Sequence, residues 1–317
     1  MKTLVTGGAG FIGSHFVRSL LADSAEQQKV TVLDALAYAG NLTNLEPVRD
    51  DPRLEFVKGD ILDGEQVAEL MAEHDAVVNL AAESHVDRSI AHGGTFVSTN
   101  VLGTQTLLEA AVRVGRTTVV HVSTDEVYGS IPEGTWTERA PLAPNSPYAA
   151  AKAGSDLLAL AYHRTHGLDV RITRCSNNYG PYQFPEKIIP LFVTRLLEGR
   201  RVPLYGDGSQ VRDWLHVKDH CRAIRLVLEG GRAGEVYNVG GGTELTNRQL
   251  TGRLLAACDA DWDSVDHVAD RKGHDLRYSV DWSKIRTELG YEPRHAFDEG
   301  LAETVAWYRE NREWWRR

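Results

Sequence analysis

Near its N-terminus the chain reads Leu4-Val5-Thr6-Gly7-Gly8-Ala9-Gly10-Phe11-Ile12-Gly13, a short β-rich run, a glycine cluster and the start of an apolar helical pattern. Gly7 permits a tight turn, Gly10 lets a pyrophosphate approach the backbone, and Gly13 lets the helix pack close to the sheet. A helix N-terminus after such a turn offers free N–H groups to phosphates. Glycine spacing also occurs in ordinary strand–helix turns, so this dinucleotide-binding prediction depends on its context.

The rest of the first half supplies that context, because β-rich runs alternate with helical segments. We expect strands at 4–6, 30–33, 54–57, 76–80, 118–122 and 170–173, and helices that include 100–114 and 147–166. Strands that are apolar on both faces and separated by helices indicate a parallel sheet between two helix layers. The predicted fold class is α/β, a Rossmann-type doubly wound parallel sheet with a smaller C-terminal substrate-binding lobe.

An acidic residue, Asp34, closes the second expected strand, about 20 residues beyond the glycines. A carboxylate there would bind the hydroxyls of an adenosine ribose and repel a 2′-phosphate, so NAD is favoured over NADP. Asp60 and Ile61 follow the third strand, where they could frame the adenine or be ordinary turn residues.

The alternation of strands and helices ends after about residue 175, where turn-rich segments begin. We expect residues 1–175 to form an NAD-binding domain and residues 176–317 to form mainly a substrate-binding domain. A segment near 214–240 should return to the first domain, and an aromatic-rich helix is expected over 300–315. Open α/β sheets bind ligands beyond the carboxyl ends of their strands, so the smaller lobe should lie there.

The composition of the 317 residues limits the classes of partner. A net charge of -9 and the lack of a long basic run argue against nucleic acid. No stretch approaches the roughly 18 apolar residues of a membrane span, and no charged leader precedes an apolar run. We expect a cytoplasmic protein that binds neither nucleic acid nor a membrane. An anionic small substrate stays open, because a few local arginines can attract one.

No metal site is expected. Cys175, Cys221 and Cys258 are far apart in the sequence and fit buried thiols in a reducing compartment. His85 and His274 lack paired ligands at the spacing of a zinc site. NAD is the one cofactor that the residues predict.

A second motif follows the fifth expected strand. Ser146 and Pro147 suit the N-cap and the first position of a helix, on which Tyr148 and Lys152 are four residues apart. A phenol titrates near 10 and is a poor base at neutral pH. A neighbouring ammonium, together with a positive nicotinamide ring, would lower the pKa of Tyr148 and make it a base. A chance pair of exposed residues is the alternative interpretation.

The glycine pattern, Asp34 and Tyr148-x-x-x-Lys152 together resemble the extended short-chain dehydrogenase/reductase superfamily. Within that superfamily the discriminating stretch is Ser123-Thr124-Asp125-Glu126-Val127-Tyr128-Gly129, since epimerases of this fold typically lack the Asp-Glu pair. Two adjacent carboxyl groups at the end of a strand suit an elimination, which needs one acid and one base.

Further segments are similar to the dTDP-glucose 4,6-dehydratase family, nearly from end to end. They cover residues 81–89, 99–101, 174–181, 185–187 and 271–275. Two features depart from the family's usual pattern. Lys272 stands where proline is common, and the loop from Gly129 to Asn145 is shorter than in many members. Neither touches a proposed catalytic group, so both bear only on substrate detail.

The resemblance implies three sets of site residues and a homodimer paired through helices 100–114 and 147–166. The catalytic set is Thr124, Asp125, Glu126, Tyr148 and Lys152. The NAD-binding set is Gly7, Gly10, Phe11, Ile12, Gly13, Asp34, Ala35, Leu36, Asp60, Ile61, Leu80, Ala81, Ala82, Ser84, Thr99, Tyr148, Lys152 and Asn178. The substrate-binding set is Ser84, Thr124, Asn177, Lys187, Ile188, Pro203, Tyr205, Arg212, Asn247, Arg271, His274 and Tyr278. The guanidinium groups of Arg212 and Arg271 suit a diphosphate.

The implied reaction converts dTDP-glucose to dTDP-4-keto-6-deoxyglucose. Tyr148 takes the proton of the C4 hydroxyl while hydride passes to NAD⁺, and Thr124 hydrogen-bonds the C4 oxygen. Glu126 then removes the C5 proton, Asp125 protonates the departing C6 hydroxyl, and hydride returns to C6. The alternatives are a nucleotide-sugar 4-epimerase, a 4,6-dehydratase for another nucleotide-hexose, and a non-catalytic NAD-binding scaffold.

Overall fold

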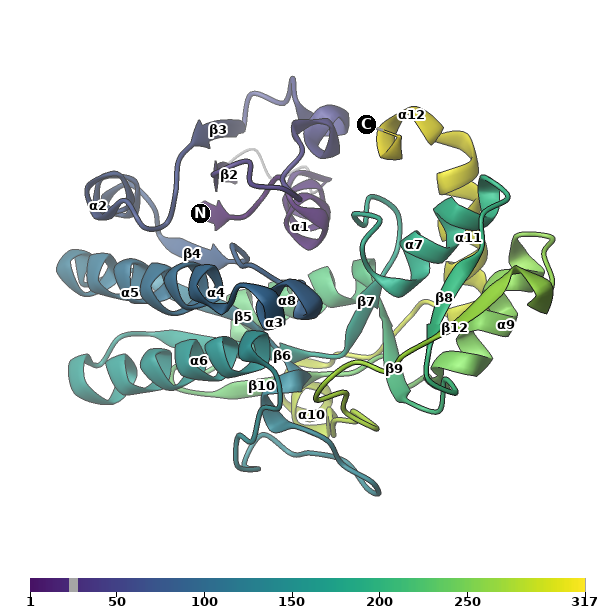
Figure 1. Cartoon of the computed structure of the whole chain (residues 1–317). Helices are drawn as coiled ribbons and strands as arrows, with labels where there is room; N and C mark the ends of the chain where they lie inside the picture. The colour runs from purple at the N-terminus through teal and green to yellow at the C-terminus, as the bar shows by residue number, and fades with distance from the viewer. Residues whose placement is uncertain (23–27, 317) are drawn as a thin grey trace.

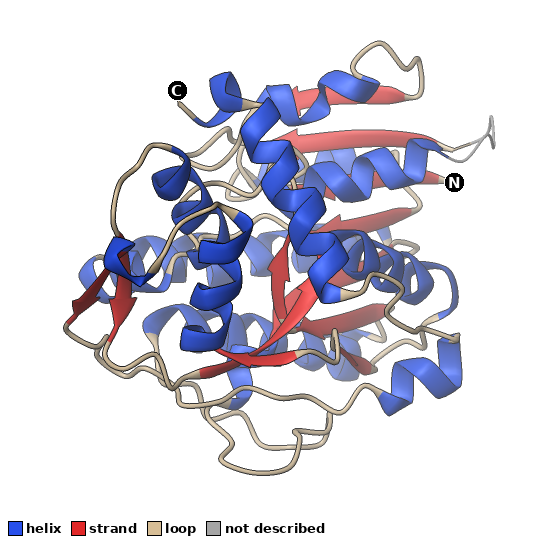
Figure 2. Cartoon of the chain, turned by 90° about the vertical axis from the view of Figure 1, so that its right-hand side faces the viewer, coloured by secondary structure: helices blue, strands red, loops and turns tan. Residues whose placement is uncertain are grey.

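The computed structural model describes residues 1–22 and 28–316, and its larger lobe is built on a parallel sheet (Figures 1 and 2). Within those residues the sheet has seven strands in the order β10-β6-β5-β4-β1-β2-β3, and every neighbouring pair is parallel. The strands are β1 (Lys2–Thr6), β2 (Lys29–Asp34), β3 (Leu54–Lys58), β4 (Ala76–Asn79), β5 (Thr118–Thr124), β6 (Val170–Cys175) and β10 (Val236–Val239). The order reverses at β1, as in a doubly wound sheet.

Helices cover both faces of this sheet. One face packs against α1 (Phe11–Ala22), α8 (Val217–Gly230) and α10 (Ser283–Leu289), and the other against α2 (Gly64–Ala72), α5 (Gly103–Val114) and α6 (Pro147–His166). Successive strand residues point to opposite faces. Val5 and Val78 therefore lie in the hydrophobic core formed with α1, α8 and α10, while Leu4 lies in the core formed with α2, α5 and α6. The predicted doubly wound α/β fold is confirmed.

Helix α6 begins and ends where the sequence predicts. The Ser146 hydroxyl accepts a hydrogen bond from the backbone N–H of Ala149, Pro147 occupies the first turn, and Gly167 ends the helix with a φ of 68°. Glycine adopts this left-handed conformation without the Cβ penalty of other residues. The helix predicted over 100–114 is not a single α-helix, since its first residues belong to the π-helical segment η2 (Val97–Leu102) and the rest to α5.

Two shorter helices, α3 (Val86–Ala91) and α4 (Gly93–Phe96), lie between β4 and η2. A 3₁₀ helix, η1 (Leu42–Val48), follows β2, and η3 (Asp125–Tyr128) continues directly from β5. The last of these places two acidic residues immediately beyond the carboxyl end of a central strand.

The second lobe lies beside the sheet on the right of Figure 1 and has its own core. Its strands are β7 (Asn177–Tyr179), β9 (Val211–His216) and β11 (Glu244–Thr246) in one small sheet, and β8 (Val202–Tyr205) and β12 (Val265–Val268) in another. Its helices are α7 (Ile188–Leu197), α9 (Asn247–Ala257), η4 (Trp262–Ser264), α11 (Phe297–Glu310) and α12 (Arg312–Trp315). The aromatic tail was predicted as one helix, but it breaks at Asn311.

That break turns the C-terminal segment back toward the larger lobe. The Trp314 indole N–H donates to Asn44 Oδ1 in η1 at 2.9 Å, and the Trp307 and Tyr182 rings pack 4.5 Å apart. None of the described helices has the length and hydropathy that crossing a bilayer requires.

Candidate active site

A cavity of about 630 Å³ lies between the carboxyl ends of the large sheet and the second lobe. It brings together residues that are far apart in the chain, from Gly7 to Tyr278. All five predicted catalytic residues line it: Thr124, Asp125, Glu126, Tyr148 and Lys152. So do all predicted substrate residues: Ser84, Thr124, Asn177, Lys187, Ile188, Pro203, Tyr205, Arg212, Asn247, Arg271, His274 and Tyr278.

The glycine turn between β1 and α1 lines the same cavity. Gly7 has a φ of 69°, in the left-handed region, and its carbonyl accepts a hydrogen bond from Gly10 N at 3.1 Å. A Cβ at Gly13 would overlap the carbonyl oxygen of Gly7, so only glycine fits there. The turn thus leaves backbone open to a ligand at the start of α1, which is the arrangement that suits a pyrophosphate.

Asp34 ties this turn to the end of β2. Its Oδ2 accepts from Ala9 N at 2.9 Å, and its Oδ1 accepts from Leu36 N at 2.8 Å. Burial raises the pKa of Asp34, and these two backbone donors oppose that rise. Each carboxylate oxygen keeps a second lone pair, so the group can still accept from a ribose hydroxyl.

The predicted cofactor residues divide into two groups. Those that line the cavity are Gly7, Gly10, Phe11, Ile12, Gly13, Leu80, Ala82, Ser84, Tyr148, Lys152 and Asn178. The rest lie outside its lining: Asp34, Ala35, Leu36, Asp60, Ile61, Ala81 and Thr99. The Ile61 side chain packs in the hydrophobic core under α5, and a Cβ on Gly103 would overlap it.

Tyr148 and Lys152 occupy the first turns of α6, and both are buried. The Lys152 ammonium donates to the carbonyl oxygen of Val122 on β5 at 2.7 Å, and burial lowers the pKa of Lys152 to about 8. The pKa of Tyr148 lies well above its usual value because of burial, followed by the charges of Glu126, Cys175 and Asp125.

Burial and the charges of Glu126, Cys175 and Asp125 are thus the main causes that raise the pKa of Tyr148, and Lys152 is not among the main causes. A hydrogen bond with Thr124 acts in the opposite direction and favours the phenolate. The expected lowering of this pKa by Lys152 together with a positive nicotinamide ring stays a prediction.

Asp125 and Glu126 stand in different environments, although they are neighbours in sequence. Burial raises the pKa of Asp125 well above its usual value, and Glu126 and Asp213 raise it further. Burial also raises the pKa of Glu126, but Lys187, Arg212 and Arg271 oppose that rise. Asp125 is therefore the group that holds a proton, and Glu126 is the one that ionises first.

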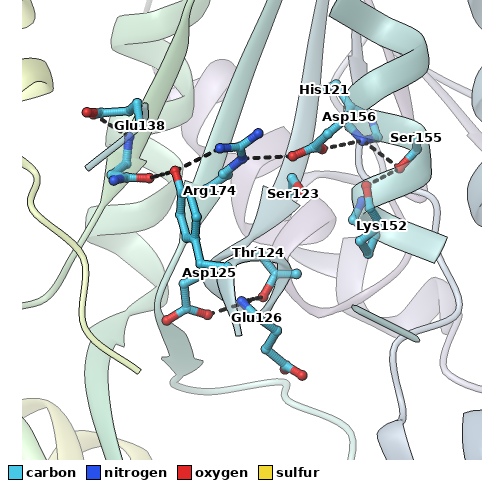
Figure 3. A network of polar contacts seen from close by, with 12 residues as sticks. His121, Ser123, Thr124, Asp125, Glu126, Glu138, Lys152, Ser155, Asp156 and Arg174 are labelled. Carbon is cyan, nitrogen blue, oxygen red and sulfur yellow. Dashed lines mark hydrogen bonds and ion pairs between the residues drawn. The ribbon is translucent and has the colours of Figure 1, made fainter. Parts of the chain in front are cut away.

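The local backbone fixes this pair in place. The Thr124 hydroxyl accepts from Glu126 N at 3.3 Å as the N-cap of η3 and donates to Asp125 Oδ1 at the same distance. Asp125 Oδ2 is buried and has no hydrogen-bond partner in the described residues. Figure 3 shows the two carboxyl groups beyond the end of the strand, with Thr124 between them and Lys152. An unpartnered oxygen of this kind is free to meet a substrate hydroxyl.

Two arginines approach the cavity from the second lobe. Arg212 donates to Asp275 O at 2.9 Å and lies over the Tyr278 ring at 4.3 Å. Arg271 lies 5.2 Å from the Tyr205 ring centre. An aromatic face and a fixed guanidinium fork together suit a planar base attached to a phosphate.

The sequence did not predict two acidic cavity residues, Asp87 and Asp275. Asp87 binds Arg271 through both carboxylate oxygens, and Asp275 accepts from the Tyr278 hydroxyl at 2.5 Å. Both lie inside segments that carried the family resemblance, so their position next to predicted site residues was the available signal.

In the described part of the chain, no group of three or more His, Cys, Asp or Glu side chains could hold a metal ion. His274 instead pairs with Asp270, with Nδ1 2.7 Å from Oδ1.

Comparison with known proteins identifies the family. The GDP-mannose 4,6 dehydratase family model matches residues 4–304. A dTDP-glucose 4,6-dehydratase from Streptomyces niveus is 63% identical over 99% of this chain and 95% of its own length. The chain belongs to the dTDP-glucose 4,6-dehydratase family. This places the dehydratase in the extended short-chain dehydrogenase/reductase superfamily, as the sequence motifs predicted.

Solved structures agree with this assignment. The dTDP-glucose 4,6-dehydratase DesIV from Streptomyces venezuelae, with NAD and dTDP bound, is 67% identical to this chain and has a TM-score of 0.98. The match covers 99% of each of the two chains. A UDP-glucose 4-epimerase from Thermotoga maritima is 33% identical with a TM-score of 0.90, over 98% of this chain and 99% of its own. Because the fold is shared across both activities, the site residues must decide between dehydratase and epimerase.

Proposed function

We propose that this dehydratase converts dTDP-glucose to dTDP-4-keto-6-deoxyglucose with NAD as a regenerated cofactor. The observation that carries the proposal is the pairing of Asp125 with Glu126 in one cavity with Tyr148, where burial and Glu126 raise the pKa of Asp125 while Lys187, Arg212 and Arg271 oppose the rise at Glu126. An elimination needs a protonated acid and an ionised base at neighbouring carbons.

The dinucleotide is held by the glycine turn and by Asp34. The backbone at Gly7, Gly10 and Gly13 receives the pyrophosphate, and the Asp34 carboxylate receives the ribose hydroxyls. When bound, NAD⁺ supplies the acceptor for hydride from C4 and later returns that hydride to C6.

The oxidation half of the reaction uses α6 and the end of β5. As its phenolate, Tyr148 accepts the proton of the C4 hydroxyl, and the hydroxyl of Thr124, which lines the same cavity, hydrogen-bonds the C4 oxygen. Lys152 anchors α6 to β5 through Val122 and contributes positive charge when protonated. The protein's own groups raise the pKa of Tyr148, and the positive charge of a bound NAD⁺ would act in the opposite direction.

The elimination half uses the two carboxyl groups. Once C4 is a ketone, the C5 proton is acidic, and Glu126 takes it because Lys187, Arg212 and Arg271 stabilise its carboxylate. Asp125, buried and protonated, gives its proton to the C6 hydroxyl, which leaves as water. When the hydride returns to C6, C5 takes up a proton that originates from solvent, and the 4-keto-6-deoxy sugar is complete. Each proton transfer contributes about 10²–10⁴-fold to the rate.

The second lobe supplies the contacts for the nucleotide. Arg212 and Arg271 bind the diphosphate, and Tyr205 packs against the base. The remaining contacts come from Asn177, Lys187, Ile188, Pro203, Asn247, His274 and Tyr278, with Ser84 from the larger lobe. The two lobes thus divide the work, with residues 1–175 and a return segment near 214–240 serving NAD and the rest of 176–317 serving mainly the substrate.

A homodimer is part of the proposal. Three large apolar side chains are exposed where η2 lies against α6: Val97 at 55%, Leu102 at 51% and Leu157 at 57%. Exposed apolar residues gathered on neighbouring helices favour burial against a second copy of the same face. A Leu157→Asp variant should shift the mass measured by light scattering from two chains to one; an unchanged mass would contradict this interface.

Product mass is the test of the proposed activity. The purified chain should be incubated with dTDP-glucose and, separately, with the UDP, GDP and CDP forms of glucose. Loss of one water from dTDP-glucose alone supports the proposal, and loss from another nucleotide form alone assigns a different substrate. A changed sugar without a change of mass would indicate an epimerase, and bound NAD without turnover would indicate a scaffold.

A further inference from the structure

A buried polar network lies directly beneath the proposed catalytic groups, and Arg174, Asp156, Tyr128, Asn238, His121 and Ser155, which form it, do not line the cavity. Its centre is Arg174 on β6, which is 3% exposed and does not line the cavity. Arg174 Nε donates to Asp156 Oδ2 at 2.8 Å, and Arg174 Nη1 donates to the Tyr128 hydroxyl at 2.8 Å (Figure 3).

The two partners of Arg174 belong to the two elements that carry the chemistry. Asp156 lies on α6, one helical turn after Lys152, and Tyr128 is the last residue of η3, which begins at Asp125. The Arg174 guanidinium therefore links α6, which carries Tyr148, to η3, which carries the two carboxyl groups of the elimination. Because a guanidinium is planar and rigid, it fixes the direction of both bonds.

The rest of the network holds each end in place. The Tyr128 hydroxyl donates to Asn238 Oδ1 on β10 at 2.8 Å. On the other side, His121 Nε2 lies 3.4 Å from Asp156 Oδ1 and 3.1 Å from the Ser155 hydroxyl. Neither end can move without breaking buried hydrogen bonds, which is costly because the freed groups have no water to replace them.

Stability alone does not account for this arrangement. Asp156 is fully buried, and although burial works against its charge, Arg174, His121 and Lys152 hold the pKa of Asp156 at about 2. A buried ion pair of this kind is often no more stabilising than apolar residues of similar volume. What it adds is directional bonding between two defined elements.

We propose that Arg174 is a positioning residue that holds the Asp125–Glu126 turn at a fixed distance from helix α6, through Tyr128 on one side and Asp156 on the other. The proposal rests on the proposed function, since it concerns the distance between the groups of the oxidation and those of the elimination. Loss of the link moves η3 relative to α6, so the elimination suffers while the oxidation, carried by α6 and Thr124, continues.

Tyr128→Phe tests this directly, because it removes the Arg174–Tyr128 bond and leaves the Arg174–Asp156 pair intact. The matched control is Tyr291→Phe, since Tyr291 is also fully buried, also donates one hydrogen bond, to Gly240 O at 3.0 Å, and also lies under an arginine, Arg222. Both variants and the wild type are mixed with dTDP-glucose while the reduced nicotinamide is followed by absorbance and the dehydrated product by mass.

The expected result is a fall in kcat of about 10–10²-fold in Tyr128→Phe with KM unchanged, as for a small misplacement of a catalytic group. Enzyme-bound reduced nicotinamide should accumulate in Tyr128→Phe and not in Tyr291→Phe. Equal behaviour of the two variants, or slowing without accumulated reduced cofactor, would overturn the proposal. Arg174→Lys, which keeps the charge but replaces the planar guanidinium fork by a single ammonium, should match Tyr128→Phe. Failure of the proposed function shows separately, as no dehydrated product from the wild type.

Discussion

Arg271 and Asp87 form a bidentate ion pair beside the cavity, with Nε 2.6 Å from Oδ1 and Nη2 2.9 Å from Oδ2. Asp87 lies in the first turn of α3 of the larger lobe, and Arg271 lies in the loop after β12 of the second lobe, 184 positions later. The Asp87 carboxylate therefore already binds the Arg271 guanidinium, which we assign to the diphosphate. This ion pair joins the two lobes at the place where the nucleotide would enter.

Asp87→Asn should tighten dTDP binding, because the mutation removes a negative charge that competes with the diphosphate for Arg271. We expect a fall in Kd of up to about tenfold, equivalent to about 1.4 kcal/mol. Arg271→Ala should weaken binding by about 10–10²-fold, the range for hydrogen bonds to charged groups. Calorimetric titration with dTDP measures both, and weaker binding in Asp87→Asn would show that the carboxylate orients the arginine instead of competing for it.

Glu126→Gln should separate oxidation from elimination. The amide cannot take the C5 proton, but Tyr148 and Thr124 are untouched, so hydride transfer to NAD⁺ should proceed and then stop. Stopped-flow absorbance should show reduced nicotinamide that does not decay, and no dehydrated product. Turnover at the wild-type rate would remove Glu126 from the role of base.

Lys152 should make stability depend on pH in the alkaline range. Burial lowers the pKa of Lys152 from 10.5 to about 8, so the folded chain binds fewer protons than the unfolded chain between those values. The cost of burying the ammonium is fully present below pH 8 and falls as the pH rises toward 10.5, by up to about 3 kcal/mol. Urea unfolding at several pH values should show the free energy of unfolding of the wild type rising relative to that of Lys152→Met over this pH window. A difference between the two that stays constant with pH would contradict the lowered pKa.

Gly13→Ala should lose the dinucleotide. The added Cβ would overlap the Gly7 carbonyl oxygen, which is backbone and cannot turn away, so the turn must open at a cost of about 1–3 kcal/mol. Gly94→Ala is the control, since a Cβ there meets nothing within 4 Å. The temperature of thermal unfolding and the amount of NAD retained after gel filtration should both fall in Gly13→Ala and not in Gly94→Ala. Equal NAD content in the two variants would count against the assigned pyrophosphate site.

Local patterns predicted the parts of the fold that depend on local physics. Helix α6 begins at Pro147 and ends before Gly167 because a capping hydroxyl, a proline and a left-handed glycine fix its ends within the sequence itself. The break at Asn311 could not be predicted in this way, since it follows from packing of Trp314 against Asn44, 270 positions away.

The site shows the same division. Sequence spacing placed Tyr148 and Lys152 on one helix face, and the family resemblance gathered catalytic and substrate residues that all line one cavity. The electrostatic balance at Tyr148 depends on burial and on acidic groups from η3 and β6, and only the folded chain brings these together. For the same reason no role for Arg174 could be predicted from the sequence, since its partners lie on two other elements.

The central claim is that a phenol and two carboxyl groups act on one hexose in a single cavity. The most direct measurement is turnover of dTDP-glucose in D₂O, with mass and NMR analysis of the sugar product. The account predicts a product that has lost one water and carries one solvent deuterium at C5, with the hydrogen of C4 found at C6. A product of unchanged mass, or a dehydrated product without deuterium at C5, would contradict it.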